Sequence, residues 1–204
     1  MAMMQVVVLA SGKGSNLQAI IDAIAVEGLP VKIVGIISDN KSAYALQRGI
    51  KHSIPVYFLN PQDASSRTEY DQQLIELCQS LKPDYICLAG YMRLLGRNFV
   101  ERFGNRIINI HPSLLPAFPG LNAQEQAYSY GVKVTGCTIH FVDQGMDTGP
   151  IIAQESVTVS DEDTLERLSQ RILEAEHRLY PKVLRLLAEN KVQLQGRKVT
   201  ISCK

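Results

Sequence analysis

The strongest constraint on the fold is the alternation, through the first half of the chain, of short apolar runs with amphipathic stretches. Gln5–Ala10 is almost wholly apolar and has the length of a buried strand, and Leu17 and Ile20 follow it at helical spacing. Strands that alternate with helices in this way form crossover units around a largely parallel sheet. We therefore predict an α/β fold with a mostly parallel twisted sheet and flanking helices.

The same pattern extends along the whole chain, with longer strands and a long C-terminal helix in the second half. The predicted strands cover residues 5–10, 31–38, 55–59, 85–89, 106–110, 134–142 and 151–159, and residues 192–194 and 199–202 are predicted to form a small hairpin. The predicted helices cover a stretch after the loop at 11–14, residues 43–51 and 68–81, a short segment around Phe99 and Phe103, residues 122–130, and a long region that ends near Glu189.

Local signals refine the second half of the prediction. Residues 111–120 hold three prolines and a glycine, which predicts an irregular loop. Ser160 followed by Asp163 is typical of a capping box, and we predict that this pair opens the long C-terminal helix. Pro181 lacks a backbone N–H, so we predict that it kinks or divides that helix.

Composition and charge exclude several classes of partner. The chain has 204 residues, of which 46% are hydrophobic and 20% charged, as expected for a globular domain with a substantial core. Its formal net charge of +1 provides no field that would attract nucleic acid or an anionic membrane. No apolar run approaches the roughly 20 residues of a membrane span. We therefore expect a cytoplasmic protein that binds neither nucleic acid nor membranes.

The four cysteines carry no metal-binding or redox signal. They form neither the close pairs of a zinc site nor a thioredoxin-type motif. We therefore expect no metal site and no catalytic cysteine among Cys78, Cys87, Cys137 and Cys203.

Residues 11–16, Ser-Gly-Lys-Gly-Ser-Asn, join the first predicted strand to the first helix. Glycines let backbone N–H groups approach a ligand, and a helix N-terminus attracts anions, so this loop favours a phosphate group and a Rossmann-like N-terminal half. A dinucleotide is an alternative, with Asp39 as the ribose-binding acid, although Leu17 replaces the third glycine of that motif. A tight turn in which Ser15 caps the helix is another.

A polar pair, Asn109 and His111, ends an otherwise apolar predicted strand. Side chains alternate along a strand, so the two share one side at its C-terminal end, where α/β proteins bind ligands. The alternative is that His111 only bonds the backbone at the strand end. The pair predicts a preorganised polar site.

Asp147 lies in the Gly-rich loop 143–150 between two predicted strands. From there it can reach His111, where a carboxylate would raise the pKa of the imidazole and keep a proton available near neutral pH. The alternative is an acid that organises only its own turn. His140, inside a predicted strand, is expected to be a satisfied buried residue, and the alternative is a direct role in the site.

Taken together, the motifs resemble a known enzyme family over nearly the whole chain. The stretch Asn-Ile-His-Pro-Ser-Leu-Leu-Pro at 109–116 is highly specific to folate-dependent formyltransferases, and the Gly-Ser-Asn loop at 14–16 is similar to that of the phosphoribosylglycinamide formyltransferases among them. The other matching motifs are Leu-Ala-Gly-Tyr-Met-Arg at 88–93, Pro-Gly at 119–120 and Asp-Thr-Gly-Pro at 147–150.

The resemblance implies a reaction and a set of site residues. 10-Formyltetrahydrofolate would be the co-substrate, without a metal, and its formyl group would pass to the amine of 5-phosphoribosylglycinamide in purine biosynthesis. Asn109 and a protonated His111 would stabilise the oxyanion, and Asp147 would keep His111 charged. Gly14, Ser15, Asn16 and Glu176 would bind the acceptor, and Arg67, Met92, Arg93, Leu94, Leu95, Asn109, Asp143, Gln144, Gly145, Met146 and Asp147 would bind the formyl folate.

The resemblance also implies one formyltransferase domain over residues 1–204, as a monomer or homodimer. Its phosphate-binding half would cover about residues 1–100, and its catalytic and folate-binding part about residues 101–204. Two residues depart from the family pattern: Lys13, where other polar residues are common, and Thr148, where glycine is common.

Four alternative functions stay open. A methionyl-tRNA formyltransferase would be expected to have a C-terminal RNA-binding domain, and a formyl-folate hydrolase an N-terminal regulatory domain. A dinucleotide-dependent oxidoreductase would rest on the first loop and Asp39 alone, and would leave Asn109, His111 and Asp147 unexplained. A non-catalytic phosphate- or folate-binding module would be excluded by a formyl-transfer assay.

Overall fold

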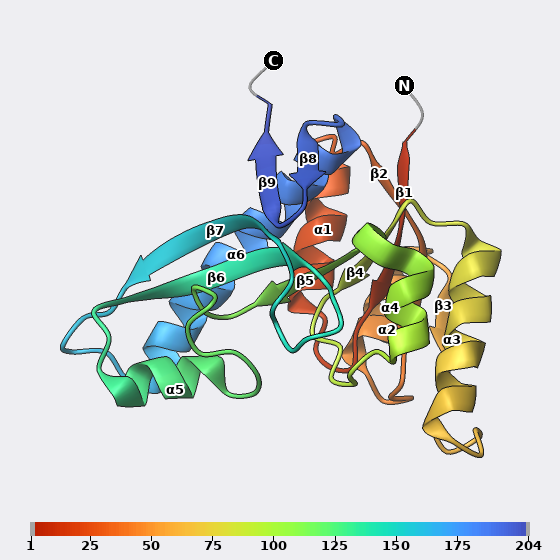
Figure 1. Ribbon diagram of the computed structural model, residues 1–204, viewed down its shortest axis with the longest axis horizontal. Coiled ribbons are helices and arrows are strands. Elements are labelled where there is room, and N and C mark those ends of the chain that lie inside the picture. The colour runs from red at the N-terminus through yellow and green to blue at the C-terminus, as the bar shows by residue number, and fades with distance from the viewer. Residues whose placement is uncertain (1–2, 203–204) are drawn as a thin grey trace. The chain divides into compact units, whose positions relative to one another are not determined.

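The computed structural model describes residues 3–202. Helices flank a seven-stranded, mostly parallel sheet with the strand order β3-β2-β1-β4-β5-β6-β7 (Figure 1), which confirms the predicted α/β class. The chain divides into two compact units, Met1–Ile108 and Asn109–Lys204. Among the described residues, none of the helices combines the length and apolar character needed to cross a membrane.

The first unit is built on four parallel strands. The run Val6, Val7, Val8 and Leu9 is fully buried, as expected where helices cover both faces of a parallel sheet. This explains why its strands read as continuous apolar runs rather than as alternating ones. The strands are β1 (Met4–Leu9), β2 (Val31–Ser38), β3 (Val56–Phe58) and β4 (Tyr85–Leu88), and β1 lies between β2 and β4.

Local signals set the ends of the helices in this unit. The Ser66 side chain accepts a hydrogen bond from the Glu69 amide and so caps α3, and Lys82, directly before Pro83, ends that helix in a left-handed conformation. The helices are α1 (Ser15–Val26), α2 (Tyr44–Lys51), α3 (Arg67–Leu81) and α4 (Arg97–Phe103), followed by the 3₁₀ turn η1 (Gly104–Arg106). Arg106 therefore lies in this turn, one residue before the strand in which it was predicted.

The second unit contains the antiparallel part of the sheet and the longest helix. The helix α6 packs on β6 and β7 through buried residues at helical spacing, among them Leu168, Ile172 and Leu179 (Figure 1). The terminal hairpin is confirmed, and β9 lies against β7. The strand β5 (Ile107–His111) begins in the first unit and ends in the second. The other elements of the second unit are α5 (Ala123–Tyr130), β6 (Val134–Phe141), β7 (Ile151–Thr158), α6 (Leu165–Ala188), β8 (Val192–Gln195) and β9 (Lys198–Ile201).

Two predictions about α6 are wrong. The helix begins at Leu165, and its cap is Thr164, whose side chain accepts from the Arg167 amide, because Ser160 and Asp163 instead hydrogen-bond each other in a separate turn before it. The helix also runs undivided through Pro181. Pro181 is buried in the apolar face of α6, so packing on the sheet outweighs the hydrogen bond that proline cannot make.

Candidate active site

Asn109 and His111 lie two residues apart in β5, and His140 lies in β6. The Asn109 amide nitrogen is 3.2 Å from His140 Nε2, and His140 Nδ1 is 2.8 Å from the Phe141 carbonyl oxygen. A carbonyl only accepts, so Nδ1 carries the proton and Nε2 accepts from Asn109. His140 thereby orients the Asn109 amide, which has a second N–H to offer a ligand.

The strand β6 turns His140 into this position through an irregularity in its pairing. The register between β6 and β7 shifts between Ile139 and His140. Such bulges redirect side chains and are frequent beside active sites. His140 was expected to be a satisfied buried residue, with a direct role in the site as the alternative. It is buried and hydrogen-bonded, but its partner is Asn109, a pairing that no local sequence signal indicates.

The loop after β5 supplies the partner of His111. His111 Nε2 donates to the Phe118 carbonyl at 2.8 Å, and Ser113 Oγ donates to the Ala117 carbonyl at 2.6 Å. The Leu115 amide donates to Thr138 Oγ1, so the loop is also tied to β6. The predicted irregular loop is thus held at several points, and it contains a cis peptide before Pro116.

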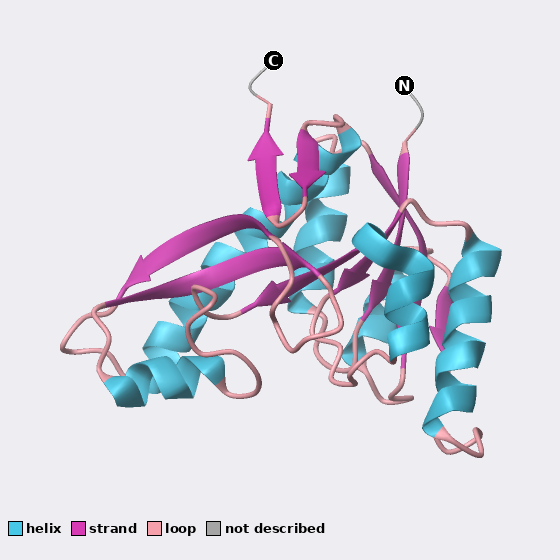
Figure 2. Ribbon diagram, viewed as in Figure 1, coloured by secondary structure: helices cyan, strands magenta, loops and turns pink. Residues whose placement is uncertain are grey.

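The structure brings Asp147 to both histidines. Its Oδ2 lies 3.3 Å from His111 Nδ1 and accepts from the Gly120 amide at 2.8 Å, and its Oδ1 lies 3.6 Å from His140 Nε2. The segment between β6 and β7 that carries Asp147 is a loop without regular structure (Figure 2). The reading in which Asp147 organises only its own turn is therefore wrong.

The electrostatics of Asp147 favour its ionised form. Burial opposes ionisation, but the hydrogen bond from the Gly120 amide and the nearby rings of His111 and His140 outweigh it and hold the pKa of Asp147 below its usual value. Both nitrogens of His111 therefore face acceptors, the Phe118 carbonyl and a carboxylate. A doubly protonated His111 satisfies both contacts, so the pair suits the stabilisation of negative charge on a substrate.

In the first unit, the loop 11–16 has the geometry of an anion site. Gly14 is the N-cap of α1, with φ 66° and no side-chain cap, and Ser15 is the first helical residue. The alternative in which Ser15 caps the helix is therefore wrong. A Cβ at Gly14 would lie 2.8 Å from Ala45 Cβ, so only glycine fits here. The α1 N-terminus thus presents backbone N–H groups without a side-chain cap.

Ser11 and Asp39 connect this loop to the segment after β4. Ser11 Oγ donates to Asp39 Oδ1 at 2.5 Å and accepts from the Met92 amide at 2.9 Å. Asp39 therefore has a structural partner at the position where a dinucleotide site would use a ribose-binding acid. Ser11 is a residue that the sequence analysis missed, because a serine in a turn carries no specific signal.

The expected folate-binding residues are found in both units. In the first unit, Arg67 donates to the Leu94 carbonyl at 2.9 Å, and the Arg93 guanidinium lies 4.8 Å from the centre of the Tyr70 ring. Met92 and Leu94 are exposed. In the second unit, Gln144, Gly145 and Met146 are exposed on the Asp147 loop, Asp143 is half-buried there, and Glu176 is buried on α6.

Three of the four cysteines are buried. Burial raises the pKa of Cys78 and of Cys137 to about 12, which disfavours a thiolate at neutral pH. Cys87 is buried as well, and Cys203 lies outside the described residues. Within residues 3–202, no group of three or more His, Cys, Asp or Glu side chains is arranged to hold a metal ion.

Comparison with known proteins agrees with this geometry. Residues 4–184 match the family described as formyl transferase. Phosphoribosylglycinamide formyltransferase of Bacillus subtilis (strain 168) is 43% identical over 180 residues, which are 88% of this chain and 92% of that protein. The crystal structure of glycinamide ribonucleotide transformylase 1 from Symbiobacterium toebii is 48% identical, with a TM-score of 0.95, and the match covers 98% of this chain and 94% of that one.

A relative with a different reaction in its name is less similar. The formyltetrahydrofolate deformylase from Pseudomonas syringae pv. tomato str. DC3000 is 28% identical, with a TM-score of 0.89 over 98% of this chain and 66% of that one. The same fold therefore occurs in proteins named for transfer of a formyl group and in one named for its removal. With the family match over residues 4–184 and these identities, the chain belongs to the formyl transferase family.

Proposed function

We propose that the chain transfers the formyl group of 10-formyltetrahydrofolate to the amine of 5-phosphoribosylglycinamide, giving formylglycinamide ribonucleotide and tetrahydrofolate. The observation that carries this proposal is the cluster of Asn109, His111 and Asp147, with Asp147 Oδ2 3.3 Å from His111 Nδ1. The relatives named for this activity cover most of the chain and support it.

The cluster suits the charge changes of formyl transfer. As the amine attacks the formyl carbon, the formyl oxygen gains negative charge, and fixed N–H donors stabilise it. Asn109 offers the amide N–H that His140 does not take, and His111 offers Nε2–H, which bonds the Phe118 carbonyl in the free protein. We propose that Nε2–H changes partner from this carbonyl to the formyl oxygen.

The proton balance needs no further reactant. The new C–N bond forms between the acceptor amine and the formyl carbon, and the bond between that carbon and N10 of the folate breaks. The amine loses one proton and N10 gains one, and His111 or a water molecule can carry it. Asp147 holds the imidazolium in place while this happens.

The loop 11–16 would bind the acceptor phosphate. The uncapped N-terminus of α1, with Gly14, Ser15 and Asn16, offers backbone N–H groups and a positive helix dipole end. Binding energy gained far from the reacting atoms then serves to position the amine. Glu176 is proposed to contact the acceptor, and Arg67, Met92–Leu95 and 143–147 the formyl folate.

The direct test is an assay of the purified protein with both substrates, and with water in place of the acceptor. Transfer that depends on phosphoribosylglycinamide supports the proposal, whereas formate release without acceptor would favour the hydrolase function. His111→Ala should lower turnover roughly 100-fold or more while acceptor binding largely survives. Turnover within about threefold of wild type would contradict the role of His111. The cytoplasmic location and the monomeric or homodimeric state stay predictions.

A further inference from the structure

The loop that carries Asp147 needs support from outside itself. It has no regular secondary structure, and Asp147 adopts φ 54°, in the left-handed region that side-chain-bearing residues adopt only at a cost. The Asp147 carboxylate must nevertheless stay close to His111 for the proposed chemistry. Contacts that favour this conformation of the loop therefore matter for catalysis.

Inside the loop, Thr148 closes a small hydrogen-bonded ring. Thr148 Oγ1 donates to Asp143 Oδ1 at 2.6 Å, and the Gly145 amide donates to the same oxygen at 3.0 Å. A Cβ at Gly145 would lie 2.0 Å from Thr148 Oγ1, so the loop is folded tightly around this hydroxyl. The departure from glycine at position 148 thus adds an internal tie.

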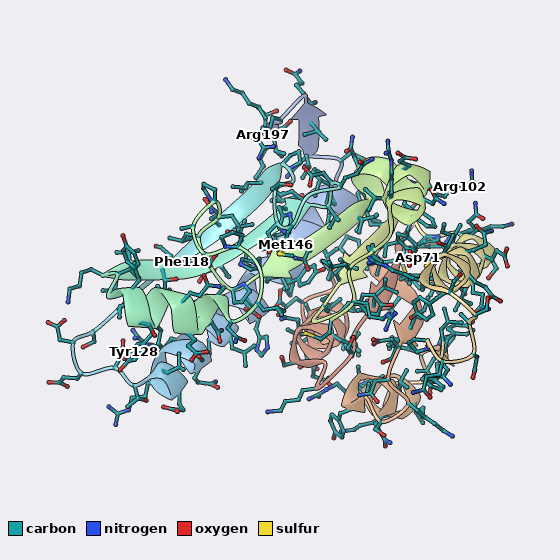
Figure 3. The ribbon with its side chains drawn as sticks, turned by 60° about the horizontal axis from the view of Figure 1, so that its bottom comes forward. Asp71, Arg102, Phe118, Tyr128, Met146 and Arg197 are labelled. Atoms are coloured by element: carbon teal, nitrogen blue, oxygen red, sulfur yellow. The ribbon has the colours of Figure 1, made fainter. Side chains whose placement is uncertain are left out.

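Outside the loop, one contact comes from the terminal hairpin. Arg197 follows Gly196 in the two-residue turn between β8 and β9, and its Nη2 donates to the Thr148 carbonyl at 2.6 Å. This carbonyl belongs to the residue directly after Asp147. The strand β9 packs against β7, which begins just after the loop, and this packing fixes the hairpin close to the Thr148 carbonyl. Figure 3 labels Arg197 on the hairpin and Met146 on the loop.

Gly149, the residue after Thr148, limits how the loop can move. A Cβ at Gly149 would lie 1.7 Å from the Phe141 carbonyl oxygen, and the Phe141 amide donates to the Pro150 carbonyl. The loop is therefore pinned against β6 on the C-terminal side of Thr148. Arg197 binds the carbonyl of Thr148, which lies between Asp147 and the fixed residue Gly149. A rotation of the backbone at Thr148 would move the Asp147 carboxylate away from His111.

We propose that Arg197 is a positioning residue, which keeps Asp147 on His111 by bracing the Thr148 carbonyl. The kinetic part of this inference rests on the proposed function, but its structural part does not. Removing the guanidinium should increase the share of loop conformations in which Asp147 is away from His111. Turnover should then fall, while the KM of the acceptor stays unchanged.

The test compares Arg197→Met, which keeps the alkyl stem, with Arg197→Lys, which keeps a donor. Lys198→Met is the matched control, because Lys198 is the exposed neighbour of Arg197 and the first residue of β9. Hydrogen exchange of the backbone amides of residues 143–149 is measured without substrates, and kcat and both KM values with them. We expect faster exchange and a roughly fivefold lower kcat in Arg197→Met, the factor that corresponds to the net contribution of a typical hydrogen bond. Arg197→Lys should restore part of both, and Lys198→Met should match wild type.

The outcomes separate the two proposals. If the loop amides of Arg197→Met exchange at the wild-type rate and its kcat equals that of wild type, the positioning role of Arg197 is refuted. Equal losses in Lys198→Met would refute it too, because they would trace to the hairpin as a whole. A wild-type protein without formyl transfer would refute the proposed function, while hydrogen exchange would still decide the brace. Thermal melting of each variant checks that the fold is retained.

Discussion

Replacing Asp147 with asparagine removes one negative charge from the site and keeps the size of the side chain. Asp147 Oδ2 lies 3.3 Å from His111 Nδ1, and the Asp147 side chain is only 14% exposed. At an effective dielectric constant of about 20, Coulomb's law gives about 5 kcal/mol of attraction at this distance. Solvent and relaxation reduce it to the roughly 1.4–4 kcal/mol that a close opposite charge usually contributes to an ionised partner.

If this energy is needed in the transition state, kcat of Asp147→Asn should fall roughly 10- to 1000-fold. The asparagine oxygen can still accept from the Gly120 amide, so the loop keeps that hydrogen bond. Formyl transfer is measured at saturating concentrations of both substrates, with Asp161→Asn as control. The Asp161 side chain is 87% exposed, and the substitution changes the net charge equally.

A folded Asp147→Asn protein with kcat within about threefold of wild type would refute the reasoning, because it would mean that the carboxylate charge does not act in the transition state. A large loss in Asp161→Asn as well would point to net charge rather than to the contact with His111. Melting curves of the variants separate both results from unfolding.

Three further predictions concern other parts of the molecule. Gly14→Ala should destabilise the protein by about 2 kcal/mol or more, because φ 66° and the 2.8 Å approach to Ala45 exclude a side chain. This should lower the melting temperature by several degrees and raise the KM of phosphoribosylglycinamide. Ser11→Ala removes the hydroxyl to which the Met92 amide donates, so the KM of the formyl folate should rise more than the KM of phosphoribosylglycinamide. A larger rise in the KM of phosphoribosylglycinamide would count against a folate-binding role for residues 92–95. The pKa of Asp147 is lowered in the folded protein, so its carboxylate stabilises the fold above about pH 4, and this contribution is lost as the pH falls through the folded pKa. In acid denaturation experiments, the difference in unfolding free energy between wild type and Asp147→Asn should therefore shrink as the pH falls. A difference that stays constant with pH would contradict this.

The sheet could be predicted from the sequence because strands that are buried on both faces appear as short apolar runs. Residues 31–38 were predicted as a strand and form β2 with the same bounds, since the strand is covered on both faces and is apolar apart from Lys32 near its start and Ser38 at its end. The start of α6 could not be read in the same way. Ser160 and Asp163 have the spacing of a capping box, but the same side chains also satisfy a turn, and only the buried face that begins near Leu168 shows where the helix packs.

The site was predictable in its members but not in its connections. Asn109, His111 and Asp147 stood out as polar residues at a strand end and in a Gly-rich loop. The contact between Arg197 and Thr148 joins residues 49 positions apart, and nothing local to either predicts it. Such long-range polar contacts depend on distances between folded elements, which the pattern of apolar residues leaves open.

The two histidines beside Asp147 differ in their hydrogen-bond partners. His140 must donate from Nδ1 to the Phe141 carbonyl and accept at Nε2 from Asn109, so the neutral form satisfies both of its contacts. His111 faces two acceptors, so its cationic form satisfies both. In the proposed mechanism the two histidines therefore have different tasks: His140 orients the amide of Asn109, and His111 provides the positive charge. Each ring donates to one backbone carbonyl, so what distinguishes the two rings is the partner of the second nitrogen, the Asp147 carboxylate for His111 and the Asn109 amide for His140.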